Sequence, residues 1–546
     1  MLAEKRKSNK WLSEALGVAP TTVSKWCTNN AQPPMETFMK IGNFWKWTSM
    51  NYSALTNWRY LKTKINIIKK YIMQLNELHI QNFRCFTDYR ITFASGLTVL
   101  FGKNGTGKTT LIHAIHKALS FAFKRNKEEK ALNLGAGFPD LKPRDYSKTE
   151  DLTRDPKTGM PFSFVNIHAC ATFEGVPLDW DMYASTSTFK VQPSKFGEAY
   201  KRLKNRIKET DQLPMFAYFS DGFPHVTKET KLSEKEMSLR NLGYLGWDEE
   251  TAYSDIWINR LTKIWTLWDR ANRTVDGEKK AIENCENAKA QGIINEEEYN
   301  ENIKIHKSRL ENAEREKSRY DNEVQAIRNC LIRFSQGDKN IEVTDFFVSV
   351  YEESGLCLQT RDGSNPSFIK LPAGYKRLFF MVLDIAYRSF VLSNGSTTDL
   401  AGIVVIDEID LHLHPELEQS VLARFRKTFP RVQFIISTHS PLVLSGVENK
   451  PENIVYSMHV DDGMRTLSVH RTYGIDANSL MTENMGASNR TSAVMEQIRA
   501  IEDCVSAKDL KKAKALLSDL EKETEPSQPE LVRLRAIIKR LEIIGR

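Results

Sequence analysis

The chain has 546 residues, of which 41% are hydrophobic and 27% are charged. This length is enough for about three domains with packed cores, which excludes a disordered protein and a disulfide-stapled mini-protein. No run approaches the roughly 18 consecutive apolar residues that a membrane span needs. The first residues also lack the apolar stretch of a secretory signal, so we expect a cytoplasmic protein without a membrane contact.

The net charge of +8 is concentrated at the N-terminus. Residues 1–73 contain 12 Lys and Arg against 3 Asp and Glu, whereas residues 74–546 contain 65 against 66. A nucleic-acid contact is therefore indicated for the N-terminal segment only. The seven cysteines stand singly, without the spacing of a zinc site, and we interpret them as reduced.

Residues 1–48 contain the run WLSEALGVAPTTVSKW (11–26), which resembles the helix-turn-helix of phage-repressor-like regulators. The resemblance implies a turn at Gly17 and a second helix that faces a DNA major groove. A small helical appendage without a DNA role is the alternative. Residues 49–72 are expected to be a linker.

The run GLTVLFGKNGTGKTTLIHAIHKAL (96–119) predicts a buried strand, a Gly-rich turn and a helix. The turn matches the pattern G-x-x-x-x-G-K-[ST], in which backbone N–H groups surround phosphate oxygens at the start of a helix. In this pattern Lys108 reaches the β- and γ-phosphates and the Thr109 hydroxyl binds Mg²⁺. The predicted nucleotide-binding residues are Gly102, Lys103, Asn104, Gly105, Thr106, Gly107, Lys108, Thr109 and Thr110.

Two further runs, GIVVIDEID (402–410) and VQFIISTHSP (432–441), predict buried parallel strands that end in polar residues. Ligand chemistry in α/β sheets is found at such carboxyl ends. We expect Asp407 to bind Mg²⁺ together with Thr109, Glu408 to orient or deprotonate the attacking water, and His439 to contact a γ-phosphate.

These three elements resemble the Walker A motif, the Walker B motif and the switch histidine of ABC-type ATPases. The runs NFRCF (82–86) and DEIDLHLHPELEQ (407–419) are similar to the chromosome-maintenance, recombination-repair and OLD-type branch of that family. The resemblance implies an α/β fold, ATP and Mg²⁺ as cofactors, Arg84 near the bound nucleotide and Asp410 in the D-loop.

This branch also has a signature loop before the Walker B strand, and LPAGYKR (371–377) is the candidate. Ala373 and Gly374 are then implied to contact the nucleotide. Pro372 stands where the family usually has a hydroxyl, which implies slow or differently gated hydrolysis. Because a signature completes the site of a second subunit, we expect a homodimer or a higher even-numbered assembly.

The 299 positions between Lys108 and Asp407 exceed a compact ABC domain, which indicates an insert. Apolar residues spaced alternately by 4 and 3 predict an antiparallel coiled-coil hairpin, with a capping box at Asn295 and Glu298. Residues 124–160 are predicted to form an exposed loop. From residue 73 we expect an ATPase N-terminal lobe (73–252), the hairpin (253–335), an ATPase C-terminal lobe (336–470) and a helical tail (471–546).

The tail lacks the spaced carboxylates of OLD-type nucleases, so the chain is expected to act through a separate nuclease. The whole combination resembles PtuA, the ATPase family of Septu-type anti-phage systems, including versions attached to retrons. That resemblance implies an HNH-type nuclease partner, PtuB, and in a retron a reverse transcriptase whose DNA–RNA hybrid holds the complex inactive. Two alternatives stay open: a DNA-repair ATPase of the recombination-mediator type, and a helix-turn-helix regulator built on residues 1–48.

Overall fold

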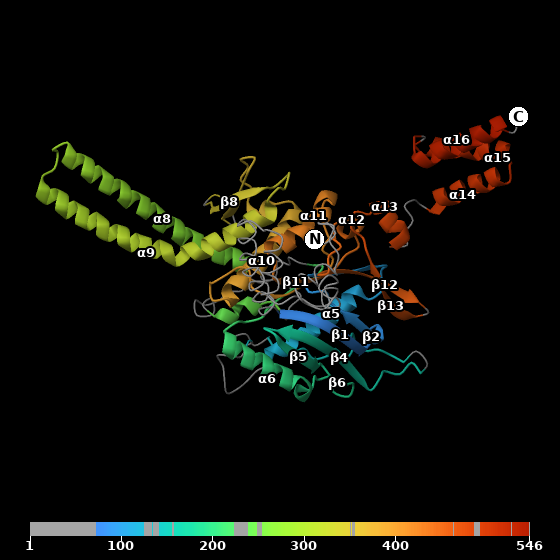
Figure 1. Ribbon diagram of the computed structural model, residues 1–546, viewed down its shortest axis with the longest axis horizontal. Coiled ribbons are helices and arrows are strands. Elements are labelled where there is room, and N and C mark those ends of the chain that lie inside the picture. The colour runs from blue at the N-terminus through green and yellow to red at the C-terminus, as the bar shows by residue number, and fades with distance from the viewer. Residues whose placement is uncertain are drawn as a thin grey trace, which may run out of the picture. The chain divides into compact units, whose positions relative to one another are not determined.

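The computed structural model describes most of the chain after residue 72 (Figure 1). The predicted helix-turn-helix and linker lie outside the described residues. No helix within these residues is both long and apolar enough to cross a membrane. The described residues are 73–124, 134, 141–155, 158–222, 239–247, 254–349, 351, 355–461, 463–484, 492–525 and 527–544.

One sheet is antiparallel, with the strand order β2-β1-β4-β5 and the short β6 paired to β4. Buried and half-buried residues alternate along most of β4, because one face of the sheet packs on the core and the other does not. The strands are β1 (Met73–Phe83), β2 (Phe86–Thr92), β4 (Phe164–Phe173), β5 (Val176–Asp181) and β6 (Ala184–Ser185).

The second sheet has six strands in the order β13-β12-β3-β11-β10-β7. All pairs are parallel except β12 with β13. Every residue of β3, β7, β10 and β11 is buried, as in parallel sheets covered on both faces. The strands are β3 (Leu97–Gly102), β7 (Met215–Phe219), β10 (Gly402–Ile406), β11 (Val432–Ser437), β12 (Asn453–Asp461) and β13 (Met464–His470). The predicted α/β fold is confirmed.

A buried glutamine joins the two sheets. The Oε1 atom of Gln433 in β11 accepts a hydrogen bond of 2.8 Å from the backbone N–H of Leu75 in β1. Its Nε2 atom donates to the carbonyls of Leu75 and Ala94, both at 2.8 Å. These bonds satisfy backbone groups beside a register shift in β1, where the ladder is interrupted.

Within the described residues, five α-helices outside the hairpin lie between strands along the chain. Helix α5 (Lys108–Leu119) follows β3, α6 (Pro193–Thr210) packs on β5, and the long α10 (Ala373–Leu392) is buried along most of its length. α11 (Pro415–Thr428) lies between β10 and β11, and α12 (Pro441–Ser445) follows β11. Short helical turns occur at Ser120–Phe123, Arg240–Tyr244, Phe368–Lys370 and Leu480–Asn484.

Two long helices, α8 (Ser254–Ala290) and α9 (Glu296–Ser335), form the hairpin in Figure 1. The Asn295 side chain accepts from the Glu298 N–H at 2.9 Å, and the Glu298 carboxylate accepts from the Asn295 N–H at 3.1 Å. This reciprocal pair is the capping box expected from the sequence. A two-stranded sheet, β8 (Val343–Val348) and β9 (Leu356–Thr360), follows α9.

The base of the hairpin, where α8 begins and α9 ends, packs on α10. Trp257 of α8 stacks on Tyr387 with ring centroids 5.0 Å apart, and its Nε1 donates to Asp384 at 2.8 Å. Arg260 of α8 binds both carboxylate oxygens of Glu323 in α9, at 2.7 and 2.9 Å. Stacking and a bidentate ion pair together fix the two helices at this end.

The C-terminal helices form a small core of their own. The short α13 (Ala477–Ser479) contacts α12 and is not part of this core. The core is formed by α14 (Ser492–Ser506), α15 (Leu510–Glu523) and α16 (Pro529–Ile544), each of which buries one apolar side. The buried residues are Ile498, Ile501, Ala513, Leu517, Leu520, Leu531, Leu534 and Ile538.

The prediction that residues 124–160 form an exposed loop is wrong in part, because residues 141–155 contain buried positions beside exposed ones. Leu141, Tyr146 and Asp151 are 2%, 4% and 2% exposed. Although the segment is rich in proline and charge, its apolar residues pack on the core and its carboxylates bind cations of the neighbouring elements. Composition alone did not reveal these partners.

Candidate functional site

The predicted site residues meet at one edge of the six-stranded sheet. Strands β3, β11 and β10 are neighbours and parallel, so their carboxyl ends lie together. Gly102 ends β3, Asp407 follows β10, and His439 follows β11 after one residue. Side chains more than 300 positions apart in the sequence are thereby brought to one place.

The Gly-rich loop, Gly102–Thr109, depends on its glycines for both conformation and space. Gly107 has φ +106° and Gly105 has φ +80°, values that side chains rarely adopt. A Cβ on Gly102 would lie 2.4 Å from the Met458 carbonyl oxygen, and one on Gly107 would lie 2.9 Å from the Phe86 ring. Gly107 is the N-cap of α5 and has no side chain that could accept from the first backbone N–H groups of the helix. These N–H groups can therefore bind phosphate oxygens.

The Lys108 ammonium is buried inside the loop. Its Nζ donates to the carbonyls of Gly102 at 2.9 Å and Lys103 at 3.1 Å. Burial lowers the Lys108 pKa, and the carboxylates of Asp407 and Glu408 act against this shift. The ammonium therefore lies in the electrostatic field of the residues that follow β10.

Asp407 is 2% exposed and accepts hydrogen bonds from the hydroxyls of Ser437 and Thr109. Burial raises its pKa, and the two hydroxyls oppose that shift. A buried carboxylate beside a threonine hydroxyl at the start of a helix is a set of hard oxygen donors. These residues fit Mg²⁺, which binds one or two carboxylates together with phosphate oxygens.

Glu408 has a backbone conformation that non-glycine residues seldom adopt, with φ +51°. Its N–H donates to the Ser437 hydroxyl at 2.9 Å, which holds this conformation in place. The carboxylate is about one-third exposed, and its Oε1 lies 4.0 Å from Nε2 of His439. Burial, followed by the charges of Asp407 and Asp221, raises the pKa of Glu408, as suits a general base.

His439 is positioned by Asp410 of the same chain. The Asp410 carboxylate accepts from the backbone N–H of His439 at 3.1 Å and from the Thr438 hydroxyl at 2.6 Å. Burial and the charge of Lys108 lower the His439 pKa, so the imidazole is neutral at physiological pH. Asp410, the residue predicted for the D-loop, therefore helps to position His439.

The candidate signature loop leads directly into α10. The helix begins at Ala373, which is exposed, and its N-cap Pro372 provides no side-chain hydrogen bond. A Cβ on Gly374 would lie 2.5 Å from the His412 carbonyl oxygen, so the start of α10 packs closely on the turn after β10. Only glycine fits this contact without a shift of backbone.

Sequence reasoning missed Arg377 in the first turns of α10. Its guanidinium is 1% exposed and donates to the carbonyls of Glu408 at 2.6 Å, Asp407 at 3.1 Å, Leu411 at 3.3 Å and Ser220 at 3.4 Å. One side chain thereby ties α10 to the turn that carries the site carboxylates. The available signal was an arginine at the start of the mostly apolar run RLFFMVLDIAY, whose one other charged residue is Asp384.

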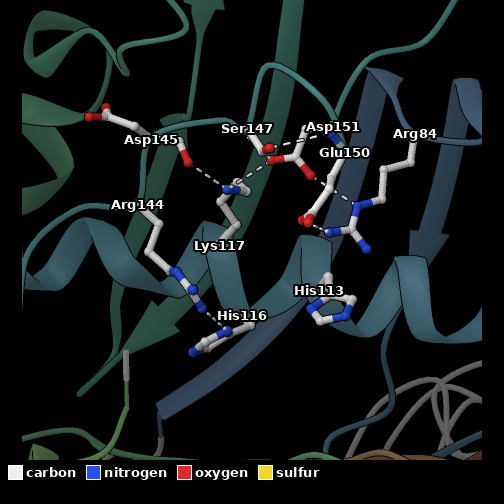
Figure 2. A pocket seen from close by; sticks show the side chains of 9 residues that line it. All are labelled: Arg84, His113, His116, Lys117, Arg144, Asp145, Ser147, Glu150 and Asp151. Carbon is white, nitrogen blue, oxygen red and sulfur yellow. Dashed lines mark hydrogen bonds and ion pairs between the residues drawn. The ribbon is translucent and has the colours of Figure 1, made fainter. Parts of the chain in front are cut away.

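Arg84 lies in the turn between β1 and β2, and Cys85 of this turn and Phe86 of β2 lie beside Gly107 of the Gly-rich loop. Figure 2 shows its guanidinium directed at Asp151, with Nε to Oδ1 at 2.9 Å. Lys117 of α5 approaches the same carboxylate at 3.3 Å. A cavity of about 150 Å³ is lined here by Arg84, His113, His116, Lys117, Arg144, Asp145, Ser147, Glu150 and Asp151.

The two histidines of this cavity are held neutral. Burial, followed by the charges of Arg84 and Arg144, lowers the His113 pKa to about 4. Arg144 donates to Nδ1 of His116 at 2.8 Å, so the proton of that ring is on Nε2, which donates to the Trp247 carbonyl. The cavity is thus a network of Arg, Lys and Asp charges beside the Gly-rich loop.

Two family models and several known proteins match parts of the chain. The family model described as "AAA domain" matches residues 77–325, and the model described as "AAA domain, putative AbiEii toxin, Type IV TA system" matches residues 371–445. The chain is 25% identical over 488 residues to "Retron Vc95 probable ATPase" of Vibrio cholerae serotype O1 biovar El Tor, covering 83% of this chain and 89% of that protein.

Two further relatives are named after retron and Septu systems. "Retron Ec83 probable ATPase" of Escherichia coli is 22% identical over 416 residues, covering 69% of this chain and 70% of that protein. "Septu protein PtuA" of Bacillus mycoides (strain KBAB4) is 32% identical over 113 residues, or 20% of this chain and 16% of that protein. The similarity to the retron proteins therefore extends over most of the chain, and the similarity to the Septu protein is local.

Proposed function

We propose that the chain is an ABC-type ATPase and the nucleotide-driven switch of an anti-phage complex, because it is similar to retron ATPases over most of its length and to a Septu protein locally. The observation that carries this proposal is the convergence of Lys108, Asp407, Glu408 and His439 at the carboxyl ends of three adjacent strands. The proposed substrate is ATP, with Mg²⁺ as the metal ion.

Each residue has a part in the proposed hydrolysis. Backbone N–H groups of the Gly-rich loop and the Lys108 ammonium bind the phosphates, while Thr109 and Asp407 hold the metal ion. Bound Mg²⁺ supplies neutralisation of the phosphate charge that develops in the transition state. Glu408 orients a water molecule and takes its proton, and neutral His439 donates from its ring to the γ-phosphate.

A homodimer is part of the proposal. The uncapped start of α10, with Ala373 exposed, provides backbone N–H groups suited to a phosphate of a second copy. The predicted arrangement is isologous: each site combines the Gly-rich loop of one copy with the α10 start of the other. Glu408→Gln should then accumulate an ATP-bound dimer in sedimentation, and an unchanged mass with ATP would contradict it.

A mixing experiment tests the sharing of sites. Ala373→Asp places a carboxylate where the phosphate would lie, yet it suits a helix N-terminus and should fold. Lys108→Ala and Ala373→Asp should each be inactive alone. An equal mixture forms about half mixed dimers with one intact site each, so about a quarter of wild-type turnover should return. No recovery would contradict shared sites, and Ala373→Ser is the control for the position.

We further propose that the ATPase controls a separate HNH-type nuclease, with a retron reverse transcriptase and its DNA–RNA hybrid holding the complex inactive. The similarity of 25% over most of a retron ATPase supports this assignment. The chain should co-purify with an HNH protein encoded beside its gene, and Lys108→Ala should abolish protection against phage. If instead only recombination repair is lost, the chain is a DNA-repair ATPase.

A further inference from the structure

A cluster of His, Cys and Asp side chains lies on the antiparallel sheet, on strands β4 and β5. His168 and Cys170 are two positions apart in β4, so they point to the same face, while the buried Ala169 and Ala171 point to the other. The pairing of β4 with β5 places Asp179 opposite Cys170 and Asp181 opposite His168. All four side chains are outside the residues used for nucleotide binding.

The spacing of three of these side chains is that of a metal site. His168 Nε2 lies 3.4 Å from Cys170 Sγ and 3.9 Å from Asp179 Oδ2, and Cys170 Sγ lies 3.9 Å from the same oxygen. Zinc bonds of about 2.0 to 2.3 Å at tetrahedral angles separate neighbouring N, S and O ligands by about 3.4 to 3.6 Å. A shift of a few tenths of an ångström would therefore bring all three atoms onto one ion.

The fourth side chain has the position of an outer partner. Asp181 Oδ1 lies 3.2 Å from Nδ1 of His168, and Asn166 donates to that same oxygen at 2.9 Å. In the neutral ring, a carboxylate on Nδ1 holds the proton there, so the lone pair of Nε2 would face Cys170 and Asp179. Metal-bound histidines are commonly oriented by such a carboxylate.

The charge of the cluster favours a cation. Glu77 of β1 pairs in register with Cys170 and adds a third carboxylate to those of Asp179 and Asp181. Arg90 lies 3.7 Å from the Glu77 carboxylate and offsets one of these three charges. Cys170 would bind a divalent ion as the thiolate, because a coordinated thiol loses its proton.

We propose that His168, Cys170 and Asp179 bind Zn²⁺, with Asp181 orienting the histidine. The mixed N, S and O ligand set is typical of zinc, whereas Mg²⁺ prefers oxygen alone. Three protein ligands leave one position on the ion for water or for Glu77. The inference does not depend on the proposed nucleotide chemistry, since it uses none of those residues.

Titration of the metal-free full-length chain with Co²⁺, in the absence of nucleotide, tests the proposal. Cobalt bound to the Cys170 thiolate gives a sulfur-to-metal charge-transfer band, which binding to oxygen ligands near Asp407 does not. We expect one equivalent of this band, displaced by Zn²⁺ and lost in Cys170→Ser. Cys285→Ser, in the hairpin, is the matched control and should keep it. An absent band, or one that persists in Cys170→Ser, would overturn the proposal.

A second measurement separates a metal site from a simple ion pair between His168 and Asp181. Asp181→Asn should weaken Zn²⁺ binding by about 10-fold to 100-fold, measured by competition with a chromogenic chelator. Zn²⁺ should also raise the unfolding temperature of the wild type, and this shift should vanish in His168→Gln. If Zn²⁺ leaves the wild-type unfolding temperature unchanged and no competition occurs, the cluster is an ion pair only and the proposal is wrong.

Discussion

Replacement of Arg377 by methionine should uncouple α10 from the turn that carries the site carboxylates. The guanidinium binds four backbone carbonyls of that turn and of the residue after β7. Methionine keeps an unbranched stem but is shorter and has no donor, so these carbonyls would lose the hydrogen bonds from the guanidinium. Arg377→Lys keeps the charge but lacks the planar fork, and it should give an intermediate effect.

The expected loss of stability follows from the bond lengths. A hydrogen bond from a charged donor contributes about 1.5–3 kcal/mol, so the two shorter bonds, at 2.6 and 3.1 Å, amount to about 3–6 kcal/mol. Part of this is offset, because burial of the guanidinium is itself unfavourable and lowers the pKa of Arg377. We expect a net loss of about 2–4 kcal/mol in the free energy of unfolding.

Thermal unfolding and steady-state ATP turnover are the assays. A displacement of Glu408 of about 1 Å would reduce turnover by about 100-fold. Arg361→Met is the matched control, because the Arg361 side chain is 74% exposed and forms a surface ion pair with Glu342. If Arg377→Met unfolds at the temperature of this control and keeps its turnover within about twofold, the explanation given for Arg377 is wrong.

Three further predictions concern single positions. Lys108→Ala should reduce ATP binding by at least about 100-fold, measured by equilibrium titration with a fluorescent ATP analogue, since it removes a charged phosphate ligand; unchanged binding would contradict the site. Gly374→Ala should lower the unfolding temperature, whereas Ala373→Ser should not, because only the former meets the His412 carbonyl; equal temperatures would refute the contact. Burial raises the pKa of Glu174 to about 7 from an ordinary value of 4.5, so the native state binds this proton more tightly than the unfolded chain. The protonated Glu174 carboxyl contributes its full stabilisation below pH 4.5, and this stabilisation is lost as the pH rises through 7. Glu174→Gln should remove this pH dependence and raise the unfolding temperature at pH 8 by about 2 °C. A variant whose unfolding temperature follows the wild-type pH profile would count against it.

The sequence was informative where a local pattern has one structural solution. The Gly-rich loop, the buried strand before Asp407 and the capping box at Asn295 are all short patterns of this kind, and each forms the expected local structure. The similarity to retron ATPases confirms that the chain is an ATPase of the expected kind.

Contacts between distant segments were not predictable in the same way. Arg377 bonds the turn after β10, and Asp151 is buried beside Arg84. Both contacts arise from the packing of elements that no local sequence pattern connects. The cluster at His168 was hidden for a related reason. Its H-x-C pair becomes informative only once the register with β5 is known, since Asp179 and Asp181 come from the opposite strand.

Helix α10 has different attachments at its two ends. Its first residues form the proposed phosphate contact, and Asp384 and Tyr387 farther along receive Trp257 from the hairpin. About 16 Å of continuous helix separates these attachments, at 1.5 Å per residue. An α-helix resists bending over so short a length, so a displacement of the hairpin base would move the proposed phosphate contact as well. We therefore expect a partner that binds the hairpin to alter the geometry of the proposed ATP site.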